Sequence, residues 1–130
     1  MHTRYASFSL DTSSNRGWFK RNITDTRLIK LTSALSPAIL RVGGSGGNCL
    51  KYNVPTSEGS LPPSCQDDAD CCMNQSQWDN LNAFAAATNT SLVFGLRATS
   101  GGPANDTVRL AEYVNAHWPL LMNGLTATSY

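Results

Sequence analysis

The sequence predicts an α/β fold in which three βα units follow one another along the chain. Three short apolar segments with strand character alternate with three segments whose apolar residues recur at helical spacing. Each crossover between strands is long enough to contain a helix, which is the connection that parallel strands require. A doubly wound sheet and a (β/α)8 barrel both begin in this way, so periodicity alone leaves both architectures open.

The first unit consists of a strand over residues 6–11 and a helix that follows it. Apolar and polar side chains alternate along residues 6–11, and a run of small polar residues comes next. Thr24 or Asp25 is the candidate N-cap of the helix. The helix carries three leucines on one face: Leu28, Leu31 and Leu35. We expect it to end at Pro37, because a proline ring is not accommodated in a helix interior.

The second unit begins with a strand over residues 38–42, which ends in the glycine-rich segment 43–47. A long insertion over residues 48–75 follows and contains all four cysteines, so we expect it to be irregular. Helical spacing then returns after Ser76, a candidate N-cap. The predicted core face of this helix consists of Trp78, Leu81, Phe84, Ala85 and Thr88.

The third unit has a strand over residues 91–96 and a glycine-rich turn over residues 98–103. A helix capped by Asn105 or Asp106 comes next. Its predicted apolar face consists of Val108, Ala111, Val114 and Trp118. The tail over residues 119–130 fits no pattern, so residues 1–130 are interpreted as one partial domain with a tail of uncertain structure.

Charge and composition exclude several classes of function. Ten Lys and Arg residues against nine Asp and Glu residues give a net charge of +1 without a basic run, which argues against nucleic-acid binding. No stretch is apolar enough to span a membrane. The segment 44–46 lacks the third glycine of a dinucleotide fingerprint, and the cysteine spacing is not that of a zinc site. We therefore predict no cofactor and no metal.

Two features favour passage through the secretory route. The first is a set of four Asn-X-Ser/Thr glycosylation sequons, at Asn22, Asn74, Asn89 and Asn105. The second is an even number of cysteines, which three alternative pairings could join in disulfides: Cys49, Cys65, Cys71 and Cys72. Residues 1–5 lack the apolar region of a signal peptide, so we expect the natural N-terminus upstream. The expected location is extracellular, after secretion, or in the endomembrane system or at the cell surface.

Three segments together resemble a known family of glycosidases. Residues 8–11 read Phe-Ser-Leu-Asp, residues 35–45 read Leu-Ser-Pro-Ala-Ile-Leu-Arg-Val-Gly-Gly-Ser, and residues 92–96 read Leu-Val-Phe-Gly-Leu. In order and spacing they resemble the opening strands of heparanase and its relatives, glycoside hydrolase family 79. The resemblance implies the first three βα units of an incomplete (β/α)8 TIM-type barrel. It also implies a parent enzyme that hydrolyses uronic-acid-containing glycans or glucuronides with retention.

The resemblance carries over four candidate substrate-binding residues: Asp11, Gly44, Ser45 and Arg97. Asp11 matches a family position that contacts the glycan, although a loop or capping carboxylate is an equal alternative. Ser45 stands where heparanase has Thr, after glycines that allow close backbone approach, but a plain glycine-rich turn also fits. Arg97 stands where heparanase has Asn, and it is either a partner for a substrate anion or a solvated loop residue. For Arg41 we expect pairing with a buried acid rather than with substrate.

No catalytic residue is carried over. In the family the acid/base is the Glu of an Asn-Glu pair that ends the fourth strand, whereas here Asn123 is followed by Gly124. The chain contains two glutamates, Glu58 in the insertion and Glu112 on the last helix, and neither position suits catalysis. We expect an inactive front portion that needs the rest of the barrel for a stable fold. The alternatives are a catalytically dead carbohydrate-binding or interaction product and a small unrelated doubly wound protein.

Overall fold

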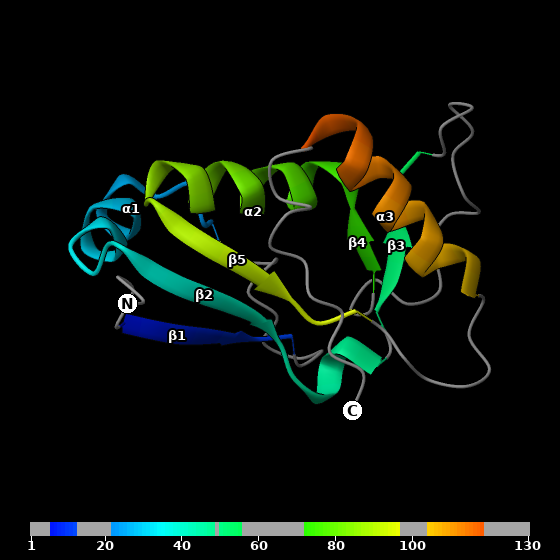
Figure 1. Ribbon diagram of the computed structural model, residues 1–130, viewed down its shortest axis with the longest axis horizontal. Coiled ribbons are helices and arrows are strands. Elements are labelled where there is room, and N and C mark those ends of the chain that lie inside the picture. The colour runs from blue at the N-terminus through cyan, green and yellow to red at the C-terminus, as the bar shows by residue number, and fades with distance from the viewer. Residues whose placement is uncertain (1–5, 13–21, 49, 56–71, 97–103, 119–130) are drawn as a thin grey trace, which may run out of the picture.

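The computed structural model describes residues 6–12, 22–48, 50–55, 72–96 and 104–118, and its centre is a parallel sheet (Figure 1). Three strands pair in the order β1-β2-β5: β1 is Ala6–Asp11, β2 is Ala38–Gly43 and β5 is Thr90–Phe94. Both pairs are parallel. The predicted strands and their parallel pairing are confirmed.

One face of this sheet is covered by helix α2, Gln75–Ala87, which runs along β5 (Figure 1). Its predicted core residues are all buried: Trp78, Leu81, Phe84, Ala85 and Thr88. On the sheet they meet two rows of aligned side chains, Phe8, Leu40 and Leu92 in one row and Leu10, Val42 and Phe94 in the next. Trp78 contacts Phe94 edge to face, with ring centroids 4.9 Å apart.

The N-cap of α2 is Asn74 and not the expected Ser76. The Asn74 side chain accepts a hydrogen bond from the Gln77 backbone N–H at 2.9 Å, and the Gln77 side chain accepts one from the Asn74 N–H at 2.8 Å. This reciprocal arrangement is a capping box, which satisfies two backbone donors that a helix start leaves unpaired. Ser76 instead lies in the first turn and donates to Asn74.

Helix α1, Thr26–Ser33, connects β1 to β2 and is capped by Asp25, one of the two predicted N-caps. Its leucine face does not pack on the sheet, because Leu28 is 40% exposed and Leu31 is 71% exposed. Leu35 follows the end of the helix and is also exposed. The buried side of α1 contains Thr32, and Ile29 packs against the core. The leucines therefore lie on one side of the helix as predicted, but this side faces away from the core.

The insertion is more ordered than expected. Strands β3, Lys51–Asn53, and β4, Cys72–Asn74, form a second, two-stranded parallel sheet. Leu50, Tyr52 and Val54 are each 1% exposed, so this region contributes to the core. The prediction of a wholly irregular insertion was wrong, since alternate residues here are apolar and are buried by their neighbours in space.

Helix α3, Ala104–His117, packs against β3 rather than along the three-stranded sheet (Figure 1). Its buried residues are Leu110, Tyr113 and Val114, whereas Val108 is 53% exposed. The buried face of α3 is therefore rotated around the helix relative to the predicted apolar face, because α3 packs on β3 of the insertion. Trp118 packs against the core, as predicted for a residue covering a sheet.

The structure confirms the α/β class with a parallel sheet. Within the described part of the chain, no helix is both long and apolar enough to cross a membrane. The predicted tail over residues 119–130 and the turn over residues 98–103 lie outside the described residues.

Candidate functional site

The carboxyl ends of the three parallel strands are held together by backbone hydrogen bonds. The Thr12 N–H donates to the Gly43 carbonyl at 3.1 Å, and the Gly95 N–H donates to the Val42 carbonyl at 2.8 Å. These bonds extend the β1–β2 and β2–β5 hydrogen-bonding ladders one residue beyond the ends of β1 and β5. Residues that follow the strands therefore emerge side by side at one edge, where ligands bind in barrels and open α/β sheets.

Asp11 and Gly44 lie against each other at this edge. Gly44 has a φ of 128°, a backbone conformation that residues with a side chain rarely adopt. A methyl group on Gly44 would overlap the Asp11 carboxylate. Two candidate substrate-binding residues are thus in contact, and the backbone angle at position 44 favours glycine.

Ser45 begins the short 3₁₀ turn η3, Ser45–Asn48, and its side chain is exposed. Gly47 is buried in this turn, and a methyl group placed on it would lie 3.5 Å from the Thr12 hydroxyl oxygen. Thr12 is 2% exposed, and its hydroxyl has no hydrogen-bond partner among the described residues. Thr12 was not predicted; its position directly after Asp11 at a strand end was the available signal.

Arg41 lies on the sheet face that α2 does not cover. Its Nη1 donates to the Ser9 hydroxyl at 3.3 Å, and its Nη2 would lie 3.3 Å from a methyl group placed on Gly43. The side chain therefore leans along β2 towards the carboxyl edge. Among the described residues Arg41 is exposed and is bound by a hydroxyl, so its pairing with a buried acid stays a prediction.

The structure thus brings together Asp11, Gly44 and Ser45, with Arg41 below them on the same face. A carboxylate accepts hydrogen bonds from sugar hydroxyls, and a guanidinium binds carboxylates and sulfates. The edge therefore offers a hydrogen-bond acceptor and a positive charge. Arg97, the fourth candidate, lies outside the described residues.

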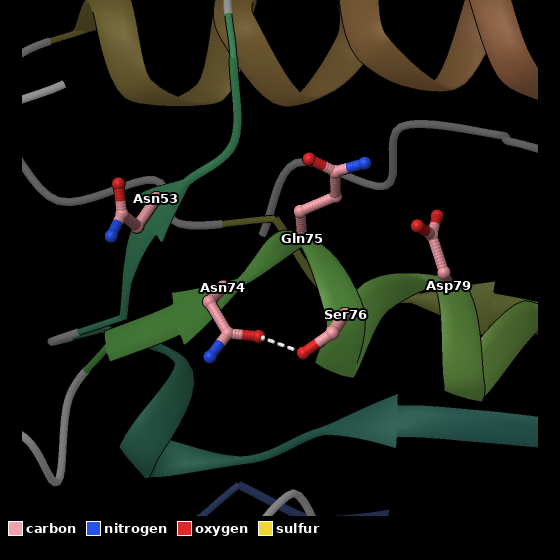
Figure 2. Close-up of a pocket in the computed structure, with 5 residues that line it drawn as sticks. All are labelled: Asn53, Asn74, Gln75, Ser76 and Asp79. Carbon is pink, nitrogen blue, oxygen red and sulfur yellow. Dashed lines mark hydrogen bonds between the residues drawn. The ribbon is translucent and has the colours of Figure 1, made fainter. Parts of the chain in front are cut away.

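A second polar feature is a shallow recess of about 340 Å³ between β3 and the start of α2 (Figure 2). Its lining consists of Asn53, Asn74, Gln75, Ser76 and Asp79. The Asp79 carboxylate accepts hydrogen bonds from the Tyr113 hydroxyl at 2.9 and 3.0 Å and from the Trp118 indole N–H at 3.2 Å. Burial, followed by this hydrogen bond to Asp79, raises the pKa of Tyr113 to about 12. Asp79 therefore joins α2 to α3.

The remaining predicted positions are exposed or lie outside the described part. Asn22, Asn74 and Asn89 are exposed, while the side chain of Asn105 lies outside the described residues. Cys72 is disulfide-bonded. Cys49, Cys65 and Cys71 lie outside the described residues, so the pairing stays open. Within the described ranges, no group of three or more His, Cys, Asp or Glu side chains could hold a metal ion.

Comparison with known proteins identifies the family of this chain. Residues 5–119 match the model of the glycosyl hydrolase family 79 N-terminal domain. Heparanase-like protein 3 of Arabidopsis thaliana is 31% identical over 103 residues, which cover 75% of this chain and 19% of that protein. Heparanase-like protein 1 of the same plant is 27% identical over 113 residues, which cover 72% of this chain and 20% of that protein.

The chain therefore spans about one fifth of the length of these relatives. The match over residues 5–119 includes all three strands of the parallel sheet and the edge that carries Asp11 and Gly44. With the family model covering most of the sequence, the chain belongs to glycoside hydrolase family 79, within its N-terminal domain.

Proposed function

We propose that this chain supplies the first strands, and part of the substrate-binding rim, of the catalytic barrel of a retaining glycosidase. The proposed substrates are uronic-acid-containing glycans or glucuronides. The observation that carries the proposal is the contact of Asp11 with Gly44 at the carboxyl edge of the parallel sheet, beside exposed Ser45. The family assignment supports glycosyl hydrolysis as the reaction.

Each residue of this edge has a proposed task. The Asp11 carboxylate accepts hydrogen bonds from sugar hydroxyls, and the missing side chain of Gly44 leaves room for this carboxylate beside the backbone. Arg41, held by Ser9, provides positive charge for the carboxylate of a uronic acid. Retaining hydrolysis further needs an acid/base and a nucleophile about 5 Å apart. We propose that both carboxylates come from strands of the barrel other than β1, β2 and β5.

We further propose that the protein passes through the secretory route. Three sequon asparagines are exposed, and Cys72 is disulfide-bonded. Disulfides persist in oxidising compartments and are rare in the cytosol. Expression with a secretory leader, followed by mass spectrometry under non-reducing conditions, tests this proposal. A secreted product with only reduced cysteines would contradict it.

A second candidate function is carbohydrate binding without catalysis. The exposed edge with Asp11 and Ser45 favours it, because this edge can contact a sugar without the catalytic carboxylates. The two functions differ in whether the complete protein, with the remaining strands of the barrel, hydrolyses a glycan. Under either, we expect the purified 130-residue chain to hydrolyse no glucuronide. Turnover by the chain alone would contradict the proposed division of the active site.

The rim is tested by binding of a short glucuronic-acid-containing oligosaccharide, measured by calorimetry or by NMR titration. Asp11→Asn keeps the shape of the side chain but removes its charge, and we expect at least a several-fold loss of affinity. Ser7→Ala is the matched control, because Ser7 is exposed on the same face of β1 at the amino end. Equal affinity of both variants would exclude Asp11 from the binding site.

A further inference from the structure

The sequon Asn74-Gln75-Ser76 lies at the junction of β4 and α2, where all three residues are exposed. The hydroxyl that a sequon requires at its third position is provided by Ser76. Residues 74–76 also line the recess described above (Figure 2). The sequon is therefore accessible in the folded chain.

The two ends of the Asn74 side-chain amide have separate roles. Its Oδ1 accepts hydrogen bonds from the Gln77 backbone N–H at 2.9 Å and from the Ser76 hydroxyl at 2.8 Å. Its Nδ2 makes no hydrogen bond to the described residues, and Figure 2 shows the nitrogen pointing away from Ser76. The helix cap thus uses the oxygen alone and leaves the nitrogen available.

An N-linked glycan is attached through this nitrogen. An amide that carries a sugar on Nδ2 keeps its carbonyl oxygen as an acceptor, so the capping bonds to Gln77 and Ser76 persist after modification. Asn74 can therefore cap α2 and carry a glycan at the same time. Glycosylation at this position does not compete with folding of the helix.

We propose that Asn74 carries an N-linked oligosaccharide and that the modified residue remains the N-cap of α2. The proposal rests on the secretory route proposed above. The donor is a polyisoprenyl-diphosphate-linked oligosaccharide. Asn74 Nδ2 forms a bond to C1 of its first sugar, the bond from C1 to the phosphate oxygen breaks, and Nδ2 loses one proton as the polyisoprenyl diphosphate leaves.

The position of Asn74 also places the glycan relative to the candidate site. Helix α2 runs antiparallel to β2 and β5, so its start lies at the carboxyl end of the sheet, where Asp11 and Gly44 meet (Figure 1). The capping bonds fix the direction in which the first sugar leaves the protein. The glycan therefore stands at the end of the sheet that carries the proposed substrate-binding edge.

The experiment is secretion of the full chain from a eukaryotic cell with a cleavable leader, followed by site-resolved mass spectrometry. An amidase that releases N-glycans in ¹⁸O-labelled water converts each occupied asparagine to labelled aspartate. We expect label at position 74. Ser76→Ala should remove this label, whereas Ser76→Thr should retain it because the sequon is kept.

The role of Asn74 as a cap is separated from the glycan by two further variants. Asn74→Asp lacks the accepting amide but keeps a capping oxygen, so we expect about the same melting temperature as for Ser76→Ala, which keeps Asn74 without its glycan. Asn74→Ala lacks both the glycan and the cap, and we expect a lower melting temperature than for Asn74→Asp. Equal melting temperatures of these two variants would overturn the capping part of the proposal.

Occupancy at the other sequons distinguishes the proposed glycosylation of Asn74 from the proposed secretory route. If Asn22, Asn89 or Asn105 carries label and Asn74 does not, the inference about Asn74 is wrong while the secretory route stands. If no sequon carries label in the secreted chain, the secretory interpretation of the sequons fails, and the inference about Asn74 fails with it.

Discussion

The two faces of the three-stranded sheet differ sharply although the same strands form them. On the covered face, Leu40 and Val42 are fully buried under α2 and adjoin Leu92 and Phe94. On the opposite face, Ser9 and Arg41 occupy neighbouring register positions and are both exposed. Alternation along each strand assigns successive residues to opposite faces, so a single strand serves both.

Under the proposed function, one face of the sheet contributes stability and the other contributes binding. Hydrophobic burial is concentrated on the α2 side, where a fully buried Leu or Phe contributes about 1.5–3 kcal/mol. The opposite face presents hydroxyls and a guanidinium, which contribute little to folding when exposed. Substitutions on the two faces should therefore have different consequences, which variants of Leu40 and Arg41 test. Measurements on Asp79 and Tyr113 test the contact of α2 with α3, and the four follow from the largest expected effect on stability to the smallest.

Leu40→Ala should destabilise the chain most. Leu40 is 0% exposed in the centre of the covered face, so its truncation leaves a cavity and should cost about 2–5 kcal/mol of unfolding free energy. Ile39→Ala is the matched control, because Ile39 is the adjacent residue on the opposite face and is half-buried. Urea denaturation followed by circular dichroism measures both. Similar losses for the two variants would contradict the assignment of the faces.

Asp79→Ala should have the next largest effect. The Asp79 carboxylate joins α2 to α3 by accepting hydrogen bonds from Tyr113 and Trp118. Without it, two donors in a partly buried region lose their partner, at a cost of about 1 kcal/mol or more. Asp79→Asn keeps one acceptor oxygen and should cost less. An Asp79→Ala variant as stable as the parent chain would show that α3 is held by other contacts.

Stability should fall at alkaline pH through Tyr113. Its folded-state pKa of about 12 lies above the ordinary value of 10.0, so the unfolded chain loses this proton first. The contribution of the neutral Tyr113 is therefore fully present below pH 10 and decreases as the pH rises towards 12. Unfolding free energies at pH 9 and pH 11 measure the slope, and Tyr113→Phe should reduce it. An unchanged slope in that variant would assign the effect to other groups.

Arg41→Gln should change the unfolding free energy least. Arg41 is exposed and, among the described residues, makes one side-chain hydrogen bond, to Ser9, so we expect a change within about 0.5 kcal/mol. Under the proposed function, the Arg41→Gln variant should nevertheless bind a uronic-acid oligosaccharide with several-fold lower affinity than the parent chain. The same titration with an oligosaccharide of neutral sugars is the control, because it lacks the carboxylate. Equal losses for both ligands would exclude charge recognition by Arg41.

The sequence located the strands well because residues 6–11 alternate between apolar and polar side chains, and the other two strands are short apolar runs followed by glycine-rich segments. It also located the core face of α2, since Trp78, Leu81 and Phe84 follow helical spacing. It misplaced the cap of α2 by two residues, because Ser76 and Asn74 are both good caps and only the backbone geometry distinguishes them. It assigned Asp11 and Gly44 to one substrate-binding rim only through the family resemblance.

Three features of the packing had no local signal. Leu28 and Leu31 face outward from α1, although their spacing alone indicated a core face. The burial of Tyr52 in the insertion depends on β4 and α3, which follow it in the chain by 20 residues or more. Arg41 binds Ser9 across 32 residues of sequence. Such contacts depend on which segments meet in space.

By itself, the sequence determined the parallel α/β class and the polar or apolar character of each strand position, because these follow from side-chain chemistry and the period of the backbone. The tertiary structure decided which face α2 covers, where α3 packs, and that the Asp11 carboxylate lies against Gly44. The physical reason is that a periodic pattern specifies a direction for each side chain, whereas the partner in that direction comes from a distant part of the chain.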